Sequence, residues 1–153
     1  MPVRIVGMEP RHWVTLTHEQ RGGRKTQTLE YTDKTQGVIA EDEHGLMAAV
    51  ILQSWTPNMC SLHAWIPRPI ALRHGFIEEV FGYVFNTCGL GLVLAAVPAN
   101  NRKAQRFNRH VGFEHTATIT DGYKPGVDMQ VWQMRREDCR WLGEQNELWQ
   151  RYA

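Results

Sequence analysis

The 153-residue sequence has few cysteines, almost no net charge and no long apolar run. Its cysteines, Cys60, Cys88 and Cys139, are odd in number and widely spaced, which suggests neither a disulfide framework nor a zinc site. The formal net charge of +1 gives no overall basis for binding nucleic acid or an anionic membrane. No apolar stretch approaches the roughly 20 residues of a membrane span, and the N-terminus lacks a signal-peptide layout. These absences favour a protein of the reducing cytoplasm with no metal site.

The composition is typical of one ordinary globular domain. Apolar residues make up 42% of the chain and charged residues 22%. A chain of this length can bury a sizeable core, and it contains no internal repeat or low-complexity segment. We therefore expect a single domain over residues 1–153.

The first half of the chain predicts mostly strands. We expect a strand over 3–8, then a short helix over 10–18 with Pro10 in its first turn. Residues 37–40 and 46–55 predict a β-hairpin with a charged tip. Residues 59–66 alternate along a further strand, which places Ser61, His63 and Trp65 on one face.

A helix and a second strand follow. The apolar positions recur with helical spacing from Ile77 to Cys88, and Gly89 ends the pattern. Residues 92–97 are an apolar run that predicts a buried strand. Strand 59–66, this helix and strand 92–97 form a βαβ unit, so the two strands are expected to be parallel with a right-handed crossover.

A short basic helix comes next. Asn100 or Asn101 is expected to cap it and Gly112 to end it. The spacing places Ala104, Phe107 and Val111 on one face. The opposite face carries the basic residues Arg102, Arg106 and Arg109.

The last third predicts a second hairpin and a terminal helix. Strands over 113–120 and 127–134 flank a six-residue loop, and a helix is expected from Asp138 onward. The fold class is therefore α/β, with a mixed sheet of about six to seven strands and helices on both faces. Two parallel strands in its middle, each followed by a helix N-terminus, offer a cleft at their carboxyl ends.

Several segments together resemble the GNAT superfamily of acetyl-CoA-dependent N-acetyltransferases. Within it, the chain is similar to the branch that acetylates ribosomal-protein and other N-termini, and to small phage-encoded relatives. The segments that carry the resemblance are Tyr83-Val-Phe85, Leu90 to Val97, Asn101-Arg-Lys-Ala104, Val111-Gly-Phe113, Asp121-Gly-Tyr123 and Asp128 to Met134. The resemblance covers about half of the chain, in the order of the family.

The resemblance implies an acetyl-CoA site in a V-shaped gap between strands 59–66 and 92–97. The pantetheine arm would pair with backbone near Trp65 and Ile66, and the pyrophosphate would lie on the following turn. Asn101 would bond the pantetheine, and Ala104 would allow close approach. The implied cofactor-binding residues are Trp65, Ile66, Arg68, Ile70, Ala71, Leu72, Arg73, Asn101, Ala104 and Asn108.

The sequence departs from the family pattern at two positions. Pro69 stands where the phosphate loop usually has a glycine, and it has no N–H to donate. Asn108 stands where many members have a tyrosine acid, and an amide donates a hydrogen bond without being a useful acid.

Acetyl transfer needs a neutral amine, and His63 is the best candidate base because an ordinary histidine pKa of about 6.5 suits that task. Glu43, in the acidic hairpin tip 41–43, and Tyr123, in the last hairpin, are candidate residues for binding the acceptor amine. For each of these side chains, a purely structural role is the alternative.

Three functions stay open. The first is an N-acetyltransferase acting on a protein N-terminus, a lysine or a small amine by direct attack. The second is a non-catalytic GNAT-fold protein of phage origin, virion-associated or interacting with a host, favoured by the altered phosphate loop. The third is nucleic-acid binding through the basic side chains of Arg102, Lys103, Arg106 and Arg109, which the near-neutral total charge disfavours. A homodimer is left open.

Overall fold

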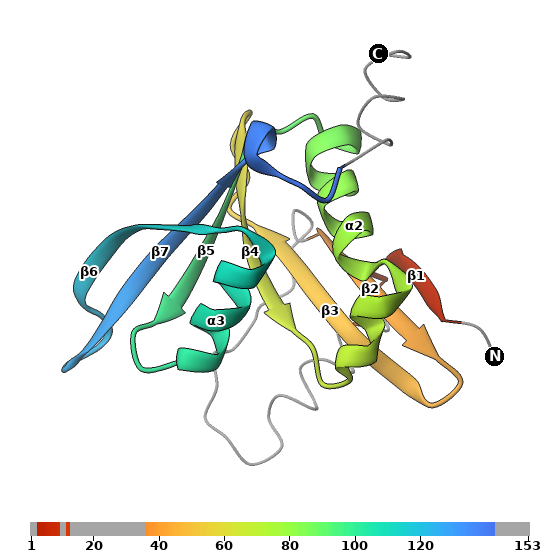
Figure 1. Cartoon of the computed structure of the whole chain (residues 1–153), viewed down its shortest axis with the longest axis horizontal. Coiled ribbons are helices and arrows are strands. Elements are labelled where there is room, and N and C mark those ends of the chain that lie inside the picture. Colours follow the sequence, from red (N-terminus) through yellow and green to blue (C-terminus); the bar gives the residue numbers. More distant parts are fainter. Residues whose placement is uncertain (1–2, 10–11, 13–35, 143–153) are drawn as a thin grey trace.

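A computed structural model describes residues 3–9, 12 and 36–142 of the chain (Figure 1). Within these residues, no helix is long and apolar enough to span a membrane. The helix predicted over 10–18 lies outside the described residues, apart from the helical position His12.

The described chain forms one seven-stranded mixed sheet in the order β1-β2-β3-β4-β5-β7-β6. The strands are β1 (Arg4–Gly7), β2 (Gln36–Asp42), β3 (Gly45–Gln53), β4 (Met59–Trp65), β5 (Leu92–Pro98), β6 (Glu114–Lys124) and β7 (Val127–Arg135). All neighbours are antiparallel except β4 and β5, which are parallel. The predicted sheet is confirmed. The sequence did not predict that β7 lies between β5 and β6.

The predicted long helix is present, but it is built in three parts. A 3₁₀ helix, η1 (Pro69–His74), leads to Gly75 in the left-handed region at φ 82°. The α-helix α2 (Phe76–Phe81) then continues as a π-helix, η2 (Gly82–Thr87). The apolar stripe predicts most of the buried face: Ile77, Val80, Phe81, Val84 and Phe85 are buried, and Cys88 is half-buried. It does not predict the change to π geometry.

The basic helix α3 (Arg102–Val111) begins and ends as expected. The Asn101 side chain accepts a hydrogen bond from the Ala104 N–H at 3.1 Å, so Asn101 is the N-cap. Gly112 ends the helix with φ 114°, a conformation that favours glycine. The buried face is more polar than predicted, because Gln105 and Asn108 are buried there with Val111.

Two predictions about the last third were wrong. The six-residue loop does not form, because β6 extends to Lys124 and pairs with Val127. Asp121 adopts φ 55° within the strand, so β6 bends there rather than ending. The terminal helix does not begin at Asp138, since residues 136–142 form only a 3₁₀ turn, η3 (Arg136–Asp138), and an irregular segment to Leu142. The rest of that prediction, over 143–153, lies outside the described residues.

The irregular segment is fixed by bonds to helix ends. The Trp141 Nε1–H donates to the Val111 carbonyl at 2.7 Å, at the end of α3. Arg136 donates to the Phe85 carbonyl and to Asn86 Oδ1 at the end of η2. The bonds to Val111 and Phe85 satisfy carbonyls near the ends of α3 and η2.

Helices α2 and α3 both lie on one face of the sheet, in front of the strands in Figure 1, whereas the sequence predicted helices on both faces. One cluster of buried residues joins them to β2–β5 and β7. A smaller cluster, with Ile39, Ala49 and Ile51 at its centre, lies on the opposite face, which we call the back face. Side chains of β4 alternate between the two: Leu62 and Ala64 pack with the helices, and Trp65 packs on the back face.

Candidate functional site

Strands β4 and β5 separate along their length. Their pairing begins at Met59–Leu92 and ends at Leu62–Ala95. Beyond that point β4 still pairs with β3 up to Trp65, and β5 still pairs with β7 up to Pro98. Only the two inner edges lose their partners, so the sheet contains a gap at the carboxyl ends of its parallel strands. Peptide groups along such edges can bind a ligand that lies between the strands as another strand would.

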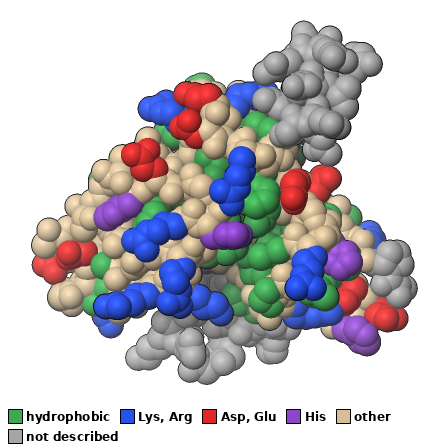
Figure 2. Space-filling model, viewed as in Figure 1, with side chains coloured by type: hydrophobic (Ala, Val, Ile, Leu, Met, Phe, Trp, Pro, Cys, Tyr) green, Lys and Arg blue, Asp and Glu red, His purple; other side chains and the backbone are tan. Residues whose placement is uncertain are grey.

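An apolar hollow borders this gap on the helix-covered face. It is lined by Val50, Leu62, Ala64, Ile66, Phe76, Ile77, Val80, Phe81, Phe107, Val111 and Phe113. Figure 2 shows Lys and Arg side chains over α3 beside hydrophobic side chains between α3 and α2. The described basic residues of α3, Arg102, Lys103, Arg106 and Arg109, are all exposed. The hollow has a volume of only about 20 Å³, so it forms an apolar wall beside the gap, with cations next to it.

Asn108 leaves a buried polar atom unpaired on α3. The residue is only 6% exposed, and its Nδ2 has no hydrogen-bond partner. Gln105, one turn earlier, is satisfied because its Nε2 donates to the Ala99 carbonyl at 2.8 Å. A buried donor without a partner costs free energy, which makes Asn108 a candidate ligand contact.

His63 is the first residue of β4 beyond its last pair with β5. It lies on the back face, because it pairs with Ile51 of the back-face cluster. Burial lowers the pKa of His63 below 6.5, since the charged imidazolium is desolvated. The ring is therefore neutral near pH 7 and can accept a proton. No hydrogen bond joins it to another described residue.

The turn after β4 is held by an ion pair that the sequence did not predict. Arg68 Nη1 lies 2.7 Å from Asp42 Oδ1, and Arg68 Nη2 lies 2.6 Å from Asp42 Oδ2. The Arg68 N–H also donates to the Met47 carbonyl at 3.1 Å. The Arg68 bonds lower the pKa of Asp42 to about 2, so the pair stays charged. The Arg68 guanidinium is thus already paired with a carboxylate.

The rest of the turn shows how η1 departs from a glycine-rich loop. Ala71 is fully buried, whereas Ile70 is 51% exposed. Leu72 is half-buried, and Arg73 is exposed with its charge toward solvent. Pro69 occupies the first position of η1. Arg73 is therefore the arginine of this turn that is available to an anion.

Each acidic side chain of the hairpin tip lies beside an arginine or a histidine. Glu41 lies 3.1 Å from His12 Nε2 and 4.0 Å from Arg4 Nη1. Glu43 lies 3.5 Å from His44 and is half exposed. Tyr123, 38% exposed, lies near the tip of the β6–β7 hairpin, at the same end of the sheet as the gap. Asp128 accepts a bond from the Asp121 N–H at 3.0 Å, which gives it a structural role in this hairpin.

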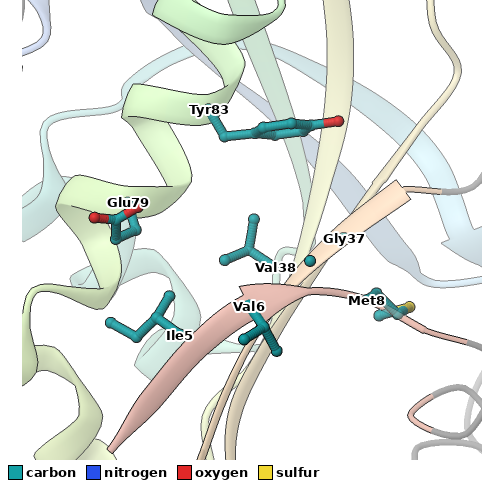
Figure 3. A pocket seen from close by; sticks show the side chains of 8 residues that line it. Ile5, Val6, Met8, Gly37, Val38, Glu79 and Tyr83 are labelled. Carbon is teal, nitrogen blue, oxygen red and sulfur yellow. The ribbon is translucent and has the colours of Figure 1, made fainter.

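A second hollow, of about 300 Å³, lies at the β1 edge (Figure 3). Ile5, Val6 and Met8 come from the β1 side, Val38 from β2, and Glu79 and Tyr83 from the helix. Burial raises the pKa of Tyr83 to about 12, so the phenol stays protonated. This hollow lies at the β1 edge of the sheet, three strands away from β4 and β5, and none of the predicted site residues line it.

The structure places His63 and Trp65 on the back face and Ile66 in the lining of the apolar hollow. Ala104 and Asn108 lie on α3, which covers the other face. It ties Arg68 to Asp42 and leaves Glu43 with His44. Sequence reasoning missed the pairing of Arg68 with Asp42. The two residues lie at the ends of strands β4 and β2, which are separated by β3 in the sheet.

Comparison with known proteins gives a structural likeness alone. No protein-family model and no curated protein matches the sequence. A variant of the spermidine N-acetyltransferase of Vibrio cholerae superposes with a TM-score of 0.76 and 12% identity, over 94% of this chain and 98% of that one. The same enzyme in a dodecameric intermediate state gives 0.72 and 12%, over 93% and 97%. A putative acetyltransferase of the GNAT family from Desulfovibrio desulfuricans gives 0.71 and 16%, over 88% and 99%.

At these identities the comparison shows the fold. The seven-stranded mixed sheet with its parallel β4–β5 pair matches the fold of GNAT acetyltransferase structures. The fold expected from the sequence segments is therefore confirmed.

Proposed function

We propose that the chain is an acetyl-CoA-dependent N-acetyltransferase that transfers an acetyl group to a primary amine by direct attack. The observation that carries the proposal is the separation of β4 and β5 after Leu62–Ala95. The fold shared with N-acetyltransferase structures supports it.

The residues present fit the cofactor. The free inner edges near Trp65 and Ile66 suit the amide groups of a pantetheine arm. Ala104 and the Asn101 cap stand at the start of α3, beside the gap. Arg73 would hold the pyrophosphate by charge, together with the backbone over Ile70, Ala71 and Leu72. Arg68 would act through Asp42, by fixing the turn.

When bound, acetyl-CoA would supply an acyl thioester whose C–S bond breaks as the amide C–N bond forms, so that coenzyme A leaves as a thiolate and takes up a proton from solvent. The residues of the chain would then do two things. His63, neutral because burial lowers its pKa, would take the proton that the amine loses as it attacks from the back face. Asn108 would donate a hydrogen bond inside the gap without giving up a proton. Glu43 and Tyr123 would border the acceptor site at the end of the sheet.

One alternative is supported by specific contacts. Asp42 already neutralises Arg68, and Pro69 has no N–H, so the turn offers less to a pyrophosphate than a glycine-rich loop would. Both observations favour the alternative that the chain is a non-catalytic protein with the GNAT fold.

Calorimetric titration and a thiol-release assay separate the two functions. We expect saturable acetyl-CoA binding at micromolar to millimolar concentration and release of coenzyme A when an amine is added. Absence of both heat and thermal stabilisation at millimolar acetyl-CoA would leave the non-catalytic function.

A further inference from the structure

The outer side of α3 carries a row of cations that the site described above does not use. The exposed basic residues of this helix, which we call the basic stripe, are Arg102, Lys103, Arg106, Arg109 and His110. With 3.6 residues per turn, they fall within about 120° of the helix circumference. The buried side, with Gln105, Asn108 and Val111, is the opposite one. The basic stripe therefore lies on the crest of α3, away from the sheet (Figure 2).

Within the described residues, no side chain of the basic stripe forms an ion pair with a carboxylate. Residues 99–113 contain no aspartate or glutamate. Glu114 is in register with Ser61 across β7 and β5, which places it on the back face. Asp121 and Asp128 accept N–H bonds inside the β6–β7 hairpin. The near-zero net charge of the whole chain thus conceals a strongly positive surface on α3.

Contacts at the end of α3 hold the basic stripe in place and lengthen it. Arg109 lies over the Trp132 ring, with its Cζ 5.5 Å from the ring centroid, and His115 stacks on the same ring at 5.1 Å. Arg140, which is exposed, donates to the His110 carbonyl and adds a cation beyond the last turn. A guanidinium that already rests on an aromatic ring loses less freedom when it binds an anion.

The spacing of the charges indicates the chemistry of the partner. Arg102 and Arg109 are about 10.5 Å apart along the helix axis. Four arginine or lysine side chains lie over that length, so one cation stands about every 3.5 Å. One strand of a DNA duplex carries a phosphate about every 3.4 Å. An extended peptide also advances about 3.4 Å per residue, so it would need an acidic side chain at nearly every position to match this density.

The surroundings of the basic stripe favour a duplex over a single strand. Proteins that bind single strands stack the bases on exposed aromatic rings. Of the described rings beside the stripe, Trp132 is 1% exposed, and Trp141 has the Arg140 Cζ 4.6 Å from its centroid. A helix with cations on its crest suits the major groove of B-form DNA, which is about 12 Å wide. The major groove of an RNA duplex is too deep and narrow for it.

We propose that α3 is a DNA-binding surface, on which the basic stripe contacts the phosphates of a duplex without reading its sequence. The row of cations that no carboxylate neutralises, at the charge spacing of one DNA strand, carries the proposal. This binding is a second activity that does not depend on acetyl transfer.

Fluorescence anisotropy with the full-length protein tests the proposal. The probes are a short DNA duplex of mixed sequence, the matching RNA duplex and one DNA strand alone, each over a salt series. Arg106→Ala changes the middle of the basic stripe, and alanine preserves the helix. Arg4→Ala is the control, because Arg4 is exposed at the β1 edge and its loss changes the net charge by the same amount.

We expect the DNA duplex to bind best. Contact with about four phosphates predicts that its affinity falls roughly 100-fold between about 50 and 200 mM salt. Arg106→Ala should lower the slope of log Kd against log salt by about one, and Arg106→Lys should restore it. Arg4→Ala should leave the slope as it is.

Tighter binding of the single strand or the RNA duplex, an unchanged slope in Arg106→Ala, or an equal effect of both alanine variants would each overturn the inference. Displacement of the DNA by acetyl-CoA, together with weaker acetyl-CoA binding in Arg106→Ala, would also overturn it, because the basic stripe would then belong to the cofactor site.

Discussion

Asp42 and Arg68 form a two-point ion pair, with Nη1 to Oδ1 at 2.7 Å and Nη2 to Oδ2 at 2.6 Å. Asp42 ends β2 at the tip of the first hairpin, and Arg68 opens the turn that leads into the helix. The pair therefore connects two loops that are 26 residues apart in the sequence. Because parallel bonds of this kind fix orientation as well as distance, the pair sets the path of the chain where it leaves the gap.

Asp42→Asn should remove a pH-dependent part of the stability. The folded-state pKa of Asp42 is lowered from 3.8 to about 2, so its contribution is present above pH 4 and lost as the pH falls through 2. The unfolding free energies of wild type and variant, measured by urea denaturation, should differ at pH 6 and converge toward pH 2. A difference that is constant over this range would contradict the ion pair.

Asn108→Leu should separate stability from function. Leucine removes a buried donor that has no partner, so the free energy of unfolding should rise by about 1 kcal/mol in the absence of ligand. Affinity for acetyl-CoA or the rate of transfer should fall. Gln105→Leu is the control on the same helix, and it should destabilise the protein because the Ala99 carbonyl loses its partner. A large loss of stability in Asn108→Leu would mean that the amide has a structural role.

His63→Gln should slow acetyl transfer by about 100-fold or more, the usual range for loss of a general base, and leave acetyl-CoA affinity unchanged. Burial lowers the pKa of His63, so the wild-type rate should decline on the acid side with a midpoint below 6.5. That decline should be absent from the variant. His44→Gln, at an exposed hairpin tip, is the control. An unchanged pH profile in His63→Gln would remove His63 from the mechanism.

Arg73→Ala should weaken acetyl-CoA binding about tenfold and reduce its dependence on salt, because an exposed arginine acts on the phosphates mainly through charge. Arg135→Ala, at the other end of the sheet, should have no effect. Equal affinities in calorimetry for Arg73→Ala and wild type would place the phosphates elsewhere.

Sequence reasoning predicted the parts of this fold that depend on local patterns. Alternation along β4 predicted which side chains share a face with His63, and the Asn101 and Gly112 signals predicted both ends of α3. The turn at Asp121 was misread as a loop. Its positive φ and its bond to Asp128 let the strand bend and continue to Lys124.

Features that depend on distant contacts could not be predicted. The place of β7 between β5 and β6 is set by tertiary pairing, and the π-helix at Gly82 has no periodic signal. Pairing of Arg68 with Asp42 likewise depends on two loops meeting in space. For the site, the sequence shows that Asn108 stands where many members of the family have a tyrosine. Only the structure shows that its donor is buried and unpaired.

Amide chemical-shift mapping during an acetyl-CoA titration tests the central claim most directly, because it reports both binding and place. The account predicts that the largest shifts occur at the inner edges of the gap, at His63–Trp65 and Ala96–Val97, and at Ala104 and Asn108 on α3. Residues at the β1 edge, such as Val6 and Tyr83, should not shift. Saturable binding with its shifts at the β1 edge, or no shifts at millimolar acetyl-CoA, would contradict a cofactor site between β4 and β5.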